Sequence, residues 1–85
     1  MLKKLLRKHY QKKYNEASDN AYEAARMLGE YMGEKAETAE EFGFEMANNM
    51  YDILIEHQQQ VMNYYLQIEC KWHNKVMSTY KTRSF

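Results

Sequence analysis

Proline is absent from this chain of 85 residues, and glycine occurs only three times, at Gly29, Gly33 and Gly43. Because proline breaks helices more strongly than any other residue, its absence leaves long helices uninterrupted. No stretch alternates apolar and polar residues over the length of a strand with turn residues on either side, so we expect no sheet. The sequence therefore predicts a single all-α domain over residues 1–85.

Cysteine and long apolar runs are equally scarce. Cys70 is the only cysteine, so no disulfide can form within the chain, and this usage is typical of a reducing cytoplasm. No apolar run approaches the core of a signal peptide or the roughly 18 residues of a membrane span. The basic first turn would suit an anionic membrane surface, but an ordinary helix start with solvated lysines is the favoured explanation. We expect a cytoplasmic protein without a membrane partner.

Motifs that carry catalysis are also missing. The sequence has no glycine-rich phosphate loop, no nucleophile elbow and no HExxH zinc motif. Cys70 and His73 have the CxxH spacing of half a zinc site, but a partly buried thiol beside a surface histidine explains them without a metal. We therefore expect no enzyme activity, no cofactor, and no catalytic or metal-binding residue.

The dominant pattern in the sequence is two stripes of apolar residues at helical spacing. The first stripe has steps of three and four residues and consists of Tyr10, Tyr14, Ala17, Ala21, Ala24, Leu28 and Tyr31. It predicts a helix over about 2–32, because such steps place side chains on one helix face. Gly33 is suited to the left-handed residue after a helix, and Thr38 with Glu41 forms a capping box. We therefore predict a turn at 33–38, a second helix over about 39–80 and a tail at 81–85.

The second helical stripe is longer. Its members are Phe42, Met46, Met50, Ile53 or Leu54, His57, Val61, Tyr64 or Tyr65, Ile68, Trp72, Val76 and Tyr80. The polar run 57–60 is where a break would fall, which would give three helices. Glutamine is a good helix former, so continuity is favoured.

A short connection makes the two helices antiparallel neighbours, so the sequence predicts a long antiparallel helical hairpin. With a turn near residue 35, Tyr14 would lie beside Glu56 and His57, and residues 71–85 would project beyond the first helix. Two helices cannot cover all of this apolar surface. We therefore expect a homodimer with a four-helix arrangement; the alternative is a three-helix monomer.

Charge is strongly segregated along the chain. Residues 1–14 carry six bases and no acid, residues 71–85 carry four bases and no acid, and all twelve acids lie in 15–70. An antiparallel hairpin brings the two cationic segments to one end, which predicts a binding surface there. Its predicted residues are Lys3, Lys4, Arg7, Lys8, Lys12, Lys13, Lys71, Lys75, Lys81 and Arg83.

Two kinds of macromolecule fit such a surface. An acidic protein surface would bind it through charge complementarity and apolar anchors from a helix face. RNA would bind it if the lysines held phosphates while aromatics such as Tyr10 and Trp72 stacked on unpaired bases. The sequence favours a protein partner and leaves RNA as the alternative, alone or together with a protein target.

The composition as a whole resembles that of small accessory proteins of AT-rich bacterial viruses. The shared features are the short length, the lack of proline, the seven methionines, the eight tyrosines and the many Lys, Asn and Glu residues. This resemblance implies a small non-catalytic protein that inhibits or sequesters a host protein, such as a defence factor, by direct binding through its cationic helical end.

Overall fold

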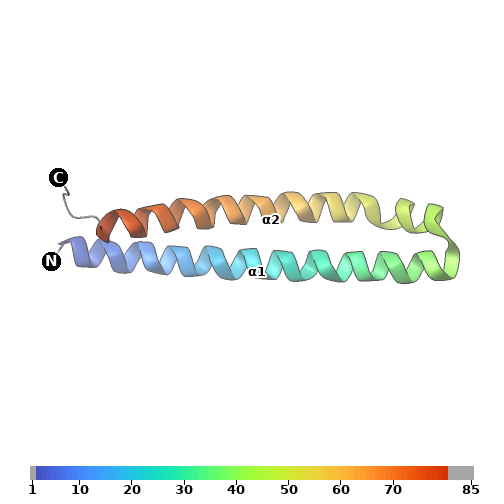
Figure 1. Cartoon of the computed structure of the whole chain (residues 1–85), viewed down its shortest axis with the longest axis horizontal. Coiled ribbons are helices and arrows are strands. Elements are labelled where there is room, and N and C mark those ends of the chain that lie inside the picture. The colour runs from blue at the N-terminus through green and yellow to red at the C-terminus, as the bar shows by residue number, and fades with distance from the viewer. Residues whose placement is uncertain (1, 81–85) are drawn as a thin grey trace.

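The computed structural model describes residues 2–80 as two long helices, α1 (Leu2–Phe42) and α2 (Phe44–Tyr80) (Figure 1). The helices lie antiparallel along their whole length and form a rod of 61 × 22 × 14 Å. The predicted all-α hairpin is therefore confirmed. The predicted tail at 81–85 lies outside the described residues. Neither helix has an apolar stretch long enough to cross a membrane within the described part of the chain.

The position of the turn differs from the prediction. The predicted turn at 33–38 is wrong, because α1 continues through this segment to Phe42. Thr38 does not cap a helix; its hydroxyl donates a hydrogen bond to the Glu34 carbonyl oxygen, at 2.9 Å, within α1. The chain reverses at Gly43, which has a φ of 95°. This left-handed conformation costs glycine little and other residues more, and Gly43 therefore sets the register of the hairpin.

The later turn changes which residues face each other. Tyr14 lies beside His73, with 5.7 Å between ring centroids, and not beside Glu56 and His57 as predicted. The predicted projection of α2 beyond α1 is also wrong for its described part, because Arg7 contacts Thr79 in the last turn of α2. With the turn at Gly43, the two helices have almost the same length, so their outer ends coincide (Figure 1).

The core between the helices is made of small side chains. The buried residues are Ala17, Ala21 and Ala24 from α1, and Ala47, Gln58, Val76 and Thr79 from α2. Alanine brings two helix backbones close together but buries little apolar area, which is why half-buried tyrosines and Trp72 flank the alanines. The hairpin is therefore long and thinly packed.

Gln58 shows how the second stripe departs from the prediction. The predicted stripe included Met46, Met50 and His57, but all three are exposed. In each case the next residue is the less exposed one: Ala47 and Gln58 are buried, and Tyr51 is half-buried. Gln58 is buried and donates a hydrogen bond from Nε2 to the Ala24 carbonyl oxygen, at 3.0 Å. Because this bond satisfies the buried amide, the polar run 57–60 remains inside a continuous α2, and the three-helix alternative is wrong.

Substitution of glycine by alanine tests the position of the turn. Gly43→Ala places a side chain at φ 95°, so we expect the free energy of unfolding to fall by about 1–2 kcal/mol. Gly29→Ala lies inside α1 with no atom within 4 Å of the new methyl group, so we expect a gain of about 0.5–1 kcal/mol. Urea unfolding followed by circular dichroism measures both. Equal effects of the two changes would contradict a turn at Gly43.

Candidate macromolecule-binding surface

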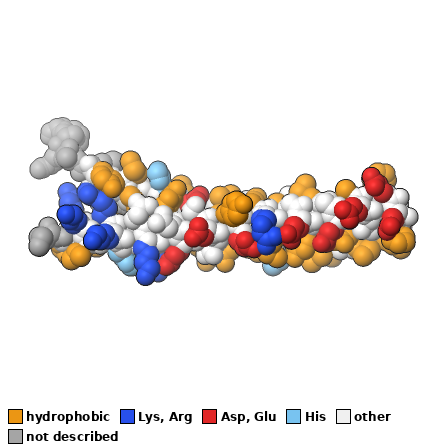
Figure 2. Space-filling model, turned by 90° about the horizontal axis from the view of Figure 1, so that it is seen from below, with side chains coloured by type: hydrophobic (Ala, Val, Ile, Leu, Met, Phe, Trp, Pro, Cys, Tyr) orange, Lys and Arg blue, Asp and Glu red, His pale blue; other side chains and the backbone are white. Residues whose placement is uncertain are grey.

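Basic side chains from both helices gather at the outer end of the hairpin, where α1 begins and α2 ends (Figure 2). The described members of this cationic end are Lys3, Lys4, Arg7, Lys8, Lys12, Lys13, Lys71 and Lys75. Lys81 and Arg83 were predicted to belong to the same surface, but they lie outside the described residues. The hairpin thus brings together eight of the ten predicted residues, although its register differs from the predicted one.

Arg7 ties the two outer ends together. Its Nε donates to Thr79 Oγ1 at 3.0 Å, and its Nη2 donates to the Thr79 carbonyl oxygen at 2.9 Å. The guanidinium carbon also lies 4.0 Å from the centre of the Tyr80 ring. The last carbonyls of a helix have no partner within the helix, so Arg7 caps α2 from the neighbouring helix. The half-buried Arg7 is therefore mainly a structural residue, and the exposed lysines present the accessible charge.

An aromatic cluster joins the helices behind the lysines. The rings of Tyr10 and Trp72 lie 5.8 Å apart at 35°, and His9 meets Trp72 edge-on at 6.2 Å. Lys71 Nζ lies 5.2 Å from the Trp72 ring centre, and Lys75 Nζ lies 5.6 Å from that of Tyr10. Such cation–π contacts hold lysine side chains over ring faces. Lys71 and Lys75 are thus held beside the rings of the aromatic cluster.

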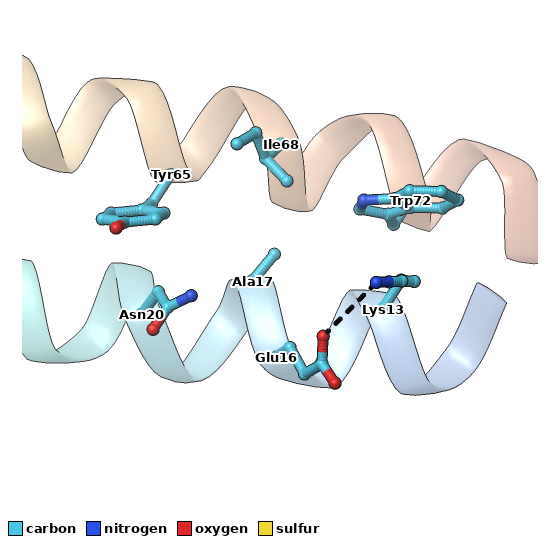
Figure 3. A pocket seen from close by; sticks show the side chains of 7 residues that line it. All are labelled: Lys13, Glu16, Ala17, Asn20, Tyr65, Ile68 and Trp72. Atoms are coloured by element: carbon cyan, nitrogen blue, oxygen red, sulfur yellow. Dashed lines mark ion pairs between the residues drawn. The ribbon is translucent and has the colours of Figure 1, made fainter. Parts of the chain in front are cut away.

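A shallow groove runs beside this cluster (Figure 3). Its volume is about 200 Å³, and Tyr65, Ile68 and Trp72 point into it from α2. Lys13 and Glu16 line the opposite side and form an ion pair, with 3.9 Å between Nζ and Oε2. The groove is smaller than the roughly 300–1,000 Å³ typical of small-molecule sites, so it does not indicate a substrate pocket.

Exposed leucines accompany the lysines. Leu2 and Leu5 are 71% and 65% exposed, and Leu6 is 40% exposed. The hairpin leaves these three leucines uncovered. Their position on the cationic end could not be read from the stripe alone, because it depends on where α2 ends relative to α1.

The turn end of the rod has the opposite charge. The exposed acidic residues nearest the turn are Glu37, Glu40, Glu41 and Glu45. The two bases of the acidic segment are paired within the hairpin: Lys35 Nζ lies 2.6 Å from Asp52 Oδ1, and Arg26 pairs with Glu23 and Glu30. The hydrogen bond from Arg26 lowers the pKa of Glu23. The rod therefore has a cationic end and an acidic end (Figure 2).

The residues considered for metal binding are not arranged as a site. Among residues 2–80, no three His, Cys, Asp or Glu side chains are placed to hold one ion. Cys70 was expected to be partly buried, but it is exposed, and its Sγ is 4.0 Å from Asn74 Nδ2. His57 and His73 are exposed as well.

Comparison with known proteins gave no match: no family model, no curated protein and no solved structure is significantly similar to the chain.

Replacement of Arg7 by lysine tests its structural role at constant charge. Arg7→Lys loses the paired contact with Thr79, so we expect the free energy of unfolding to fall by about 1–2 kcal/mol. Amide hydrogen exchange should become faster in the last turn of α2. Lys8→Arg, at an exposed neighbouring position, should change stability by less than about 0.5 kcal/mol. Unchanged amide hydrogen exchange in the last turn of α2 of the Arg7→Lys variant would contradict a capping role for Arg7.

Proposed function

We propose that this chain is a non-catalytic binding protein whose cationic end docks on an acidic surface of another protein and blocks it. The observation that carries the proposal is the combination of exposed leucines and free lysines on α1. No ion pair in the described part of the chain involves Lys3, Lys4 or Lys8, and Leu2 and Leu5 lie among them.

The two kinds of side chain have separate roles in binding. Lysines at one end of an elongated molecule steer it toward an acidic surface and orient it on approach. Leucines provide the apolar contact that holds the complex, because each buried side chain contributes about 1.5–3 kcal/mol. A protein surface provides apolar contacts as well as carboxylates. A phosphate backbone provides only the charge.

The proposed biological role follows the compositional resemblance to small accessory proteins of bacterial viruses. In the cytoplasm of a host cell, a small helical rod of this kind would sequester or inhibit one host protein, for example a defence factor. It would act in stoichiometric amounts, because the proposed mechanism blocks a surface and involves no reaction.

RNA binding is the second candidate, and one observation favours it. Lys71 and Lys75 lie next to Trp72, which lines a groove open to solvent. This arrangement of lysines and an aromatic ring is typical of sites that hold single-stranded nucleic acid. If RNA is the partner, log affinity should fall with log salt concentration at a slope of about −0.7 per phosphate contacted.

Removal of three lysines tests whether the cationic end binds. The variant Lys3→Gln/Lys4→Gln/Lys8→Gln is compared with the control Asn48→Asp/Asn49→Asp/Gln59→Glu. Each changes the net charge by −3 at exposed positions, but the control changes lie outside the cationic end. Fluorescence titration with a glutamate-rich peptide should show binding at least about tenfold weaker for the first variant only. An equal loss in both would indicate a response to net charge and contradict a local site.

Removal of the leucines distinguishes the two partners. Leu2→Ser/Leu5→Ser keeps every charge, so we expect RNA binding to be unchanged. Binding to a protein target, captured from bacterial lysate treated with nuclease, should fall by about tenfold or more as the apolar contact is lost. Because both leucines are largely exposed, the helix content should stay the same. Capture that depends on RNA and ignores the leucines would contradict a direct protein contact.

A further inference from the structure

Two shallow hollows adjoin each other on one side of the rod. The first is the groove beside the aromatic cluster (Figure 3), and the second, of about 250 Å³, lies next to it on the side of the turn. Asn20 and Tyr65 line both hollows, so the two form one continuous channel between α1 and α2. We call this channel the lateral groove.

The lining of the lateral groove repeats every seven residues in both helices. In α1 the first hollow is lined by Lys13, Glu16, Ala17 and Asn20, and the second by the residues seven positions later. In α2 the first hollow is lined by Tyr65, Ile68 and Trp72, and the second by the residues seven positions earlier. Seven residues make about two helical turns, or about 10.5 Å. A third helix along the groove would therefore find equivalent surroundings after each of its own heptads.

Each hollow has room for one large apolar side chain. The hollows measure about 200 and 250 Å³, whereas a cavity of about 150 Å³ already holds a benzene-sized group. The buried Ala17 lines the first hollow and the buried Ala24 lines the second, and such small residues let another helix approach closely. In helical bundles a side chain of one helix enters a hole between residues of its neighbours. The lateral groove therefore has the form of a seam that a third helix can fill.

The positive charge of the lateral groove is concentrated at its outer end. Lys71 and Lys75 flank Trp72 there, with their Nζ atoms 5.2 and 5.9 Å from the centre of its ring. Neither lysine belongs to an ion pair within residues 2–80. In the second hollow the only charged lining residue is Glu23, which pairs with Arg26. A helix with carboxylates over the outer end and few charges elsewhere would therefore complement the groove.

The lateral groove leads toward the leucines of the cationic end. Leu2, Leu6, His9 and Lys13 follow one another in steps of 4, 3 and 4 residues, so they share one face of α1. Lys13 lines the groove, and His9 meets Trp72 edge-on at 6.2 Å. A helix in the groove would therefore pass along this face and reach the exposed leucines.

We propose that the lateral groove binds an amphipathic α-helix of the target protein. Apolar side chains of that helix enter the two hollows at heptad spacing, and its carboxylates lie over the outer end. The inference rests on the proposed function, because it states in what form the acidic surface of the target is held. From Met27 to Leu2 the groove and its continuation are about 37 Å long, which matches a helix of about 25 residues.

The fluorescence of Trp72 tests whether a helix occupies the groove. Trp72 is the only tryptophan in the chain, and it lines the first hollow. The probe is a designed helical peptide of about 25 residues without tryptophan, with leucines at the a and d positions of each heptad and glutamates in one half. It should shift the emission of Trp72 to shorter wavelengths, because the bound helix covers the ring. A peptide with serines in place of the leucines should bind at least about tenfold more weakly, and equal binding of the two would overturn the proposal.

Substitutions inside and outside the groove test its position. Ile68→Asp places a charge in the first hollow, so binding of the leucine peptide should weaken by about tenfold or more. Leu66→Asp is the matched control: Leu66 is 43% exposed, lines neither hollow and lies roughly 200° around α2 from Ile68. Asn20→Arg fills the middle of the groove from an exposed position, so it should weaken binding without disturbing the core, whereas Asn63→Arg should not. Equal effects of each variant and its control would overturn the proposal.

The lysine variant separates failure of the groove from failure of the proposed function. If Lys3→Gln/Lys4→Gln/Lys8→Gln weakens binding of the leucine peptide while Ile68→Asp and Asn20→Arg do not, the cationic end binds without the groove. That result overturns the groove proposal alone. The reverse pattern supports the groove and overturns the role of the lysines in the proposed function.

The same signal detects the other occupants of the groove. Oligouridine, added without peptide, should leave the emission of Trp72 unchanged at concentrations that saturate with the leucine peptide. Raising the concentration of the chain alone should also leave it unchanged. A shift in either experiment would place RNA or a second copy of the chain in the groove and overturn the proposal.

Discussion

The position of Gly43 is the constraint on which the rest of this structure depends. A left-handed residue ends α1 at Phe42 and starts α2 at Phe44, and from that point the two helices pair residue by residue to their outer ends. Because they are nearly equal in length, the first turn of α1 meets the last turn of α2, and Arg7 reaches Thr79. A turn ten residues earlier would separate these groups by about 30 Å or more at the helical rise, since both helices would shift in register.

Thin packing is the second property that connects fold and function. An alanine-lined interface lets the helices approach closely, but it buries few large side chains, and within residues 2–80 no large side chain is fully buried. Methionine, isoleucine, leucine and tyrosine side chains therefore remain on the outside, where they can contribute to association with other molecules. The same chain gathers its charges at opposite ends. The outside of the rod therefore combines uncovered apolar side chains with segregated charges.

The sequence was sufficient to predict two helices and their antiparallel pairing, but not the register in which they pair. The absence of proline and the stripe from Tyr10 to Tyr31 predicted α1 correctly over most of its length. Gly33 and Thr38 gave strong local signals for a turn, yet both are accommodated inside α1, where Thr38 bonds to the Glu34 carbonyl. Local signals could not choose among the three glycines, because each of them can adopt the left-handed conformation and only the fit of the two helices along their length selects Gly43. For the same reason, hydropathy favoured Met46 and Met50 as core residues, whereas the smaller Ala47 is buried.

The gathering of lysines was predictable, because any antiparallel hairpin turning near the middle brings the two basic segments together. The contacts of Arg7 with Thr79 could not be predicted, because they depend on the register of the two helices.

The contact between Arg7 and Thr79 spans 72 residues of sequence, whereas contacts near Gly43 join close neighbours. Closing a loop costs more entropy as the loop grows. The helix–helix contacts next to the turn should therefore form first during folding, and those at the outer ends last. Those ends should also be the first to fray when the protein opens locally. The region proposed to meet a target is then the most adaptable part of the rod, and it can adjust its shape while the turn end stays intact.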